Sequence, residues 1–129
     1  MFPADLKYSK EHEWIRVEGD RGRVGITHHA QNSLGDVVFV DLPKVGRAVM
    51  QTETFGVVES VKAVSDLYAP VGGEVVEANA ELEKKPELVN TDCYGAGWMI
   101  VVKIANPKEL DNLMDATSYE AYLAAEGSH

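Results

Sequence analysis

Lys62 is the residue whose type and position in this chain most clearly suggest chemistry. It is the only basic side chain between Arg47 and Lys84, and the small, uncharged Val61 and Ala63 flank it. Apolar runs on both sides predict two strands joined by a tight turn. An amine exposed there is accessible to a modifying enzyme, and acylation would remove its charge. The long side chain would then be the base of a flexible tether. The pattern favours covalent attachment at Lys62 over a place on a solvated charged face.

Catalytic and metal-binding roles find less support. The adjacent His28 and His29 cannot both present their rings to one metal from a regular strand, and no Cys or carboxylate cluster has ligand spacing. Ser60 and Ser65 lack the glycine-flanked turn of a nucleophilic serine. The glycines of segment 95–97 lead into a strand and not into a helix, so they do not form a phosphate-binding loop. We therefore expect no catalytic residue and no metal site.

Composition limits the class of protein and its partners. The 129 residues are 45% hydrophobic and 26% charged, which is ordinary for a globular chain with a core. A formal net charge of −9 argues against nucleic acid as a partner. The longest apolar run, near Val37 to Val40, is the length of a strand and too short to span a membrane. The single Cys93 excludes an intrachain disulfide and is interpreted as a structural, partly buried side chain. The first residues show no signal for secretion or import, although a processed precursor would look the same.

Short strands dominate the pattern that must position Lys62. We expect strands at 12–17 (within the segment 8–17), 23–26, 36–42 (mostly buried) and 98–104, and a hairpin within 55–70 whose tip is 61–63. Thr27 and Gly35 are suited to begin and end a short helix, and 86–90 is expected to form one helical turn after a polar connection at 81–86. Together these short strands predict a compact barrel or sandwich.

The C-terminal part changes to helical periodicity. Asn106 can cap a helix, and a second short helix is expected to begin near Ser118, which gives a helical appendix at about 106–126. Tyr119 and Tyr122 are interpreted as packing residues of that helix, and the two tryptophans, Trp14 and Trp98, as core anchors. We expect a single domain over 1–129, in which 127–129 resembles a cloning remnant.

The segment around the lysine resembles the lipoyl-attachment segment of the glycine cleavage system H-protein family. It reads Glu59-Ser60-Val61-Lys62-Ala63, followed by Ser65-Asp66 and Tyr68-Ala69-Pro70. The resemblance extends from about Leu6 to Leu123, and other matching segments are Lys7-Tyr8-Ser9, His12-Glu13-Trp14, Gly25-Ile26-Thr27, His29-Ala30-Gln31, Leu34-Gly35-Asp36-Val37-Val38, Leu42-Pro43, Gly73-Glu74-Val75, Pro86-Glu87-Leu88-Val89-Asn90 and Gly97-Trp98.

Neighbouring carrier families differ at the turn. Biotin carriers have methionines on both sides of the lysine, and lipoyl domains of 2-oxoacid dehydrogenases usually have Asp before it, whereas this chain has Val61 and Ala63. Val64 departs from the family because it is bulkier than Ala or Thr. This difference would affect how a loaded arm packs and should leave attachment intact.

The resemblance implies a barrel-sandwich hybrid, similar to lipoyl and biotinyl carriers, with an N-terminal β extension and short C-terminal helices. It implies lipoic acid in amide linkage on Lys62 and a carrier without catalysis of its own. The arm would take an aminomethyl group from glycine decarboxylase (P protein) to aminomethyltransferase (T protein). Dihydrolipoamide dehydrogenase (L protein) would reoxidise the arm, and a lipoate-attaching enzyme would install it. The location implied is the cytoplasm of a prokaryote, or the mitochondrial matrix for a processed eukaryotic chain.

The resemblance also implies roles for other residues. Recognition around the attachment site would involve Glu59, Ser60, Val61 and Ala63, and a cleft for the loaded arm would involve Glu13, His29 and Asp66. From the residues alone, Glu13 is an ordinary exposed strand carboxylate, and Asp66 could equally cap the turn. Glu59 and Asp66 could instead be recognition points for the lipoylating enzyme.

Two other functions stay open. One is an interaction module whose Lys62 is never modified, and the other is a lipoyl donor to other proteins.

Overall fold

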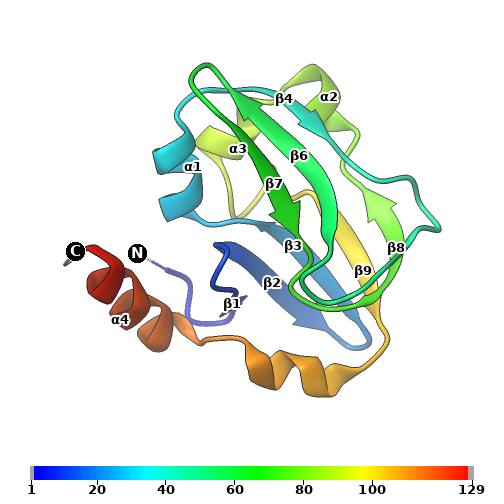
Figure 1. The fold of residues 1–129 in the computed structure, drawn as a ribbon. Coiled ribbons are helices and arrows are strands. Elements are labelled where there is room, and N and C mark those ends of the chain that lie inside the picture. Colours follow the sequence, from blue (N-terminus) through cyan, green and yellow to red (C-terminus); the bar gives the residue numbers. More distant parts are fainter. Residues whose placement is uncertain (1, 128–129) are drawn as a thin grey trace.

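The computed structural model describes residues 2–127 and contains two antiparallel sheets with short helices around them (Figure 1). The larger sheet has the strand order β1-β2-β3-β9-β8-β5, formed by Lys7–Tyr8, Glu13–Glu18, Arg21–Ile26, Ile100–Ile104, Gly73–Ala78 and Ala48–Val49. The smaller has the order β4-β6-β7, formed by Val37–Asp41, Thr54–Ser60 and Val64–Tyr68. The expected mainly β fold is confirmed, as two sheets and not as a closed barrel.

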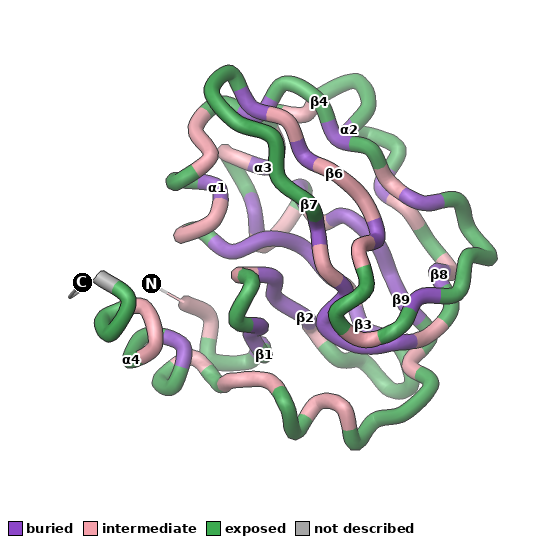
Figure 2. The backbone as a smooth tube through the Cα atoms, in the orientation of Figure 1, coloured by how far each residue is buried: buried purple, intermediate pink, exposed green. Residues whose placement is uncertain are grey.

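One hydrophobic core joins the two sheets. Val24, Ile100 and Val102 of the larger sheet belong to the same buried cluster as Phe55 and Leu67 of the smaller sheet. In the tube view the buried segments line the interior between the sheets (Figure 2). The small sheet is therefore held against the large one, which fixes the base of the β6–β7 hairpin.

A second cluster lies at the N-terminal edge. Leu6, Tyr8, Trp14 and Tyr119 are its buried members. The Trp14 ring fits because a Cβ on Gly25 would lie only 2.7 Å from it, and its indole N–H donates to the carbonyl of Cys93 at 3.0 Å. Trp14 is therefore a core anchor as predicted. Trp98 is half-buried and lies under the Arg23 guanidinium, 5.1 Å from the ring centroid.

The helices are short. They are α1 His28–Leu34, α2 Glu81–Lys84, α3 Leu88–Thr91, a 3-10 helix at Pro107–Asn112 and α4 Ala116–Gly127. The predicted ends of α1 are confirmed, because the Thr27 hydroxyl accepts from the Ala30 N–H at 3.2 Å and Gly35 has a φ of 79°. No helix within residues 2–127 has both the length and the apolar character needed to cross a membrane.

Several predictions about single elements were wrong. The expected polar connection at 81–86 contains α2, because Leu82 is buried in the main core and anchors a helical turn. The strand at 36–42 is not mostly buried, since Val38 and Phe39 are 55% and 51% exposed.

Two further elements can be compared with their expected bounds. The strand expected at 12–17 is confirmed as β2, Glu13–Glu18, and it begins directly after His12, which adopts a left-handed φ of 73°. The last helix begins before Ser118, because the Asp115 carboxylate accepts from the Ser118 N–H at 2.8 Å within its first turn. The sequence suggested a cloning remnant at 127–129. Residues 128 and 129 of it lie outside the described part of the chain.

Candidate functional site

Lys62 lies exposed at the tip of the hairpin formed by β6 and β7. The Ser60 N–H donates to the Ala63 carbonyl at 2.8 Å, and the Ser60 hydroxyl accepts from the Ala63 N–H at 3.0 Å. The tip is also tied to the neighbouring loop, because the Val61 N–H donates to the Asp36 carbonyl at 3.0 Å. These bonds hold the turn rigidly while the lysine side chain extends from it.

The residues around Lys62 differ in exposure. Val61 is 75% exposed and Ala63 is also exposed, so both are accessible to an enzyme that approaches the lysine. Glu59 is half-buried and pairs across the sheet with Phe39 and Val64. Ser60 is only 8% exposed and organises the turn, a structural role that the sequence did not reveal. The turn is thus held by Ser60 and not by Asp66.

A cleft of about 270 Å³ opens beside this hairpin. Its walls come from the turn between β1 and β2, the adjoining ends of β2 and β3, helix α1, and the strands β6 and β7. The structure brings Glu13, His29 and Asp66 together in this cleft, although 53 residues separate the two acids in the numbering. The full lining is Glu11, His12, Glu13, Ile26, His29, Ala30, Ser33, Leu34, Val58, Ser65, Asp66 and Leu67.

Glu13 is the buried acid of the cleft. It is 2% exposed, so its expected place as an exposed strand carboxylate is wrong. Its side chain points inward, where Oε1 accepts from the Ser9 hydroxyl at 2.7 Å and Oε2 accepts from the Tyr68 N–H at 3.2 Å. Burial raises the pKa of Glu13 to about 8, against the lowering effect of these two hydrogen bonds. At neutral pH this carboxyl therefore holds a proton for much of the time.

Helix α1 connects the cleft to the lysine. Ala30, Ser33 and Leu34 line the cleft, and a Cβ on Gly35, which ends the helix, would lie 3.3 Å from Cε of Lys62. The lysine stem thus passes over the C-terminal end of the helix whose side forms the cleft wall. An arm that extends Lys62 would begin at one end of α1, and the cleft lies along the same helix.

Asn90 of α3 fixes the end of α1. Its amide N–H groups donate to the Gly35 carbonyl at 2.8 Å and to the Gln31 side chain at 3.1 Å, and its carbonyl accepts from the Val37 N–H at 2.9 Å. The sequence suggested only a helical turn here. Only the hydrogen bonds in the structure reveal that Asn90 braces the end of α1.

His12 is a cleft residue that the sequence reasoning missed. It lies next to Glu13, its ring is 4.7 Å from that of His29, and its Nδ1 lies 2.8 Å from the Tyr119 hydroxyl. Burial, together with the neighbouring His29, lowers the pKa of His12. Its left-handed backbone has no sequence signature, because that conformation is typical of glycine.

Potential metal-binding side chains and a thiol group are also present in the described part of the chain. Among residues 2–127, no three His, Cys, Asp or Glu side chains lie close enough to hold a metal ion. Burial raises the pKa of the Cys93 thiol to about 11, which disfavours the reactive thiolate. The structural interpretation of Cys93 agrees with this.

Comparisons with known proteins point to one family. Residues 6–126 match a family model described as glycine cleavage H-protein. A glycine cleavage system H protein of Symbiobacterium thermophilum is 66% identical over 120 residues, covering 93% of this chain and 94% of the relative. One of Carboxydothermus hydrogenoformans is 59% identical over 127 residues, covering 98% of each chain. The crystal structure of a glycine cleavage system H protein from Mycobacterium marinum superposes with a TM-score of 0.88 at 42% identity, covering 95% of this chain and 99% of the other.

Proposed function

The chain belongs to the glycine cleavage H-protein family, and from this premise we propose that it is a carrier whose lipoyl arm is attached to Lys62. The observation that carries the proposal is an exposed lysine at a rigid tip, joined through α1 to a cleft with a buried carboxyl group. In this function the chain is a component of a multienzyme system and does not itself catalyse the reaction.

The residues present fit a lipoyl group in amide linkage. Lys62 is exposed and unhindered, and the cleft combines apolar walls, such as Leu34 and Leu67, with the acids Glu13 and Asp66. When bound, the arm supplies a dithiolane that accepts an aminomethyl group and is later reoxidised. The surrounding residues would position this cargo and exclude water from it.

Glu13 and Asp66 suit a cationic cargo. A positive group that approaches a carboxyl stabilises its ionised form, so Glu13 would lose its proton as the cargo enters. The new ion pair would form where water is excluded, which strengthens it. His29 and Ser33 of α1 would close the wall beside the cargo.

The partners proposed are those that the family name implies. They are glycine decarboxylase (P protein), aminomethyltransferase (T protein), dihydrolipoamide dehydrogenase (L protein) and a lipoate-attaching enzyme. Glu59, Val61 and Ala63 would contact the attaching enzyme, since they surround Lys62 at the accessible tip. The bacterial relatives support a cytoplasmic location.

Intact-mass analysis tests the attachment site. The parent protein is incubated with a lipoate ligase, lipoate and ATP, beside Lys62→Arg and the control Lys44→Arg, which changes another exposed lysine. We expect one added lipoyl group on the parent and on Lys44→Arg, and none on Lys62→Arg. A folded parent that gains no mass would instead support an unmodified interaction module. Transfer of the lipoyl group onward to a second apo-protein would identify a lipoyl donor.

A further inference from the structure

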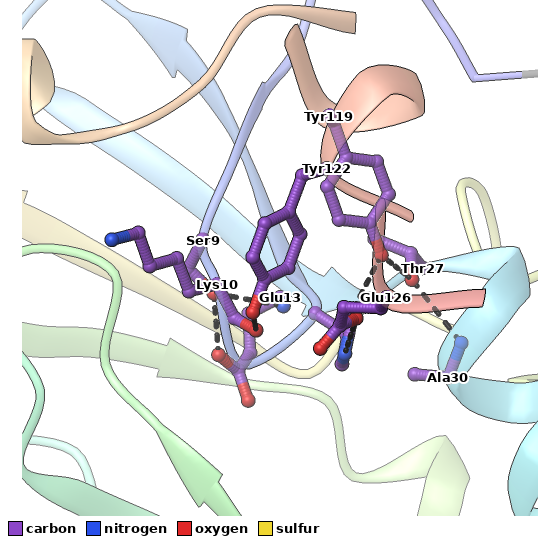
Figure 3. Close-up of polar contacts among 9 residues, drawn as sticks. Ser9, Lys10, Glu13, Thr27, Ala30, Tyr119, Tyr122 and Glu126 are labelled. Carbon is purple, nitrogen blue, oxygen red and sulfur yellow. Dashed lines mark hydrogen bonds and ion pairs between the residues drawn. The ribbon is translucent and has the colours of Figure 1, made fainter. Parts of the chain in front are cut away.

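The hydroxyl of Tyr119, on α4, lies between two walls of the cleft. Tyr119 is fully buried, and its oxygen is 2.8 Å from the Thr27 hydroxyl and 2.8 Å from Nδ1 of His12 (Figure 3). Thr27 is the cap of α1, which forms one wall, and His12 belongs to the turn that carries Glu13. A single hydroxyl group thus connects the C-terminal helix to both sides of the cleft.

Counting donors and acceptors favours one arrangement of the protons in this network. The Thr27 oxygen accepts from the Ala30 N–H, and its own proton is satisfied if it donates to the Tyr119 oxygen. The Tyr119 hydroxyl then donates to Nδ1 of a neutral His12, which carries its proton on Nε2. This tautomer directs the Nε2–H toward Glu126, whose carboxylate is 3.7 Å away. With a proton on Nδ1 instead, one of the two hydroxyl protons, that of Tyr119 or that of Thr27, would lack an acceptor among these groups.

We propose that Tyr119 is a positioning residue of the cleft, whose hydroxyl fixes the spacing between the turn that carries Glu13 and the capped end of α1. The expected effect of Tyr119 on the lifetime of the cargo rests on the proposed function. Its role in positioning the cleft walls rests only on the geometry of the unmodified protein.

The backbone of His12 supports this assignment. A non-glycine residue with a φ of 73° is strained, and such strain persists only where the surroundings impose it. The His12 N–H donates to the Ser9 carbonyl at 3.1 Å, and its carbonyl accepts from the Thr27 N–H at 3.0 Å. The Tyr119 hydroxyl holds the ring of this strained residue. Without it, only the backbone bonds of His12 would hold the turn against α1, and the turn beside Glu13 would open more often.

Protonation of His12 would open the same network. The titratable groups that face its ring are Glu126 of α4, Glu11 of its own turn and His29 of α1, and the Tyr119 and Tyr122 rings lie against it. A doubly protonated imidazole cannot accept from Tyr119. The Thr27–Tyr119 and Tyr119–His12 hydrogen bonds would then both have to run in the opposite direction. Burial and His29 lower the pKa of His12, so the closed network is kept at neutral pH and is lost on acidification.

Tyr119→Phe and Tyr122→Phe form a matched pair for the test. Tyr119→Phe keeps the ring that stacks on Tyr8 at 4.8 Å, so the fold should be retained, which a thermal melt checks. Tyr122→Phe removes a second hydroxyl from the same helix, one that donates to the Lys10 carbonyl at 3.4 Å and also interacts with Glu126, but contacts neither Nδ1 of His12 nor Thr27. The difference between the two variants therefore isolates the hydroxyl that is shared by His12 and Thr27.

Nitrogen NMR of His12 and amide hydrogen exchange are measured on the unmodified protein. In the parent and in Tyr122→Phe we expect the tautomer protonated on Nε2. In Tyr119→Phe we expect this preference to be lost and exchange at residues 9–13 and 28–31 to rise about tenfold, as expected for the loss of a buried hydrogen bond. An unchanged tautomer and unchanged exchange in Tyr119→Phe would overturn the proposal.

The lifetime of the cargo supplies a second readout. Water releases ammonium and formaldehyde from an aminomethyl-loaded arm and leaves the dithiol, so ammonium release reports how well the cleft excludes water. We expect release about tenfold faster in Tyr119→Phe than in Tyr122→Phe, with equal rates of lipoylation, and faster release from the parent at pH 5 than at pH 7. Equal release from both variants would refute the positioning role. Failure of the parent to be lipoylated would overturn the proposed function alone, because the NMR readout would still decide the network.

Discussion

At the scale of single residues, the burial of Glu13 determines what the cleft can do. An acid that is 2% exposed, with both oxygens accepting hydrogen bonds, is held in one orientation before any cargo arrives. Its raised pKa means that the empty cleft can keep this acid neutral and avoid the cost of a buried, unpaired charge. A cationic group would convert it to the carboxylate at the moment when that charge becomes paired.

The same burial predicts how stability depends on pH. The folded pKa of Glu13, about 8, lies above its ordinary value of 4.5, so the folded state binds more protons between these values. Its contribution to the free energy of unfolding is therefore full below pH 4.5 and falls as the pH rises toward 8, by at most about 1.4 kcal/mol for each pH unit. Glu13→Gln should remove this slope, as measured by urea denaturation from pH 5 to 9. The exposed Glu74→Gln serves as control, and a slope that persists in Glu13→Gln would contradict the assignment.

At the scale of elements, α1 matters because it contributes to both parts of the site. Seven residues long, it is too short to be stable on its own and depends on its caps and its packing. Thr27 caps its beginning, and Asn90 of α3 binds its end, where the stem of Lys62 passes. Any displacement of α1 would therefore move the cleft wall and the surroundings of Lys62 together.

Asn90→Ala should weaken this connection. The change leaves the Gly35 carbonyl and the Val37 N–H without their partner, which costs about 1–3 kcal/mol for buried groups. We expect the free energy of unfolding to fall by an amount in this range in chemical denaturation. Asn32→Ala, an exposed change on α1 itself, should alter it by less than about 0.5 kcal/mol. Equal stability of the two variants would show that Asn90 does not brace the helix.

At the scale of the whole molecule, two hydrophobic clusters support different parts of the site. The main core holds the hairpin that carries Lys62, and the second cluster, which includes Tyr8, Trp14 and Tyr119, holds α4 and the turn beside the cleft. Strand β2 joins them, because Ile15 belongs to the first and Trp14 to the second. We propose that residues 2–127 unfold as one domain.

Phe55→Ala tests this cooperativity. Phe55 is 1% exposed in the main core, so the truncation should cost about 3–5 kcal/mol. Tryptophan fluorescence reports mainly on the second cluster and amide NMR signals of β6 on the first. In a single domain both probes should shift to the same lower denaturant midpoint. The exposed Val45→Ala should leave the midpoint unchanged. Separate midpoints would indicate two units.

Much of the fold followed from local signals in the sequence. Alternating apolar residues and turn residues predicted the β6–β7 hairpin, and Thr27 and Gly35 predicted both ends of α1, because capping and strand pairing use neighbouring residues. Where an element depends on distant packing, prediction failed. Leu82 makes α2 helical by entering the core, and Val38 and Phe39 stay exposed where the pairing of β4 with β6 is irregular, between Val37 and Phe39.

The sequence by itself determined the mainly β fold and indicated Lys62 as an exposed residue on a tight turn, since both follow from patterns within a few residues. Its resemblance to one family supplied the candidates Glu13, His29 and Asp66. Only the tertiary structure decided that these three share one cleft, that Glu13 is buried, and that Tyr119 contacts both His12 and Thr27. The burial and the pKa of a side chain depend on tertiary contacts between distant segments, and local sequence patterns do not predict those contacts.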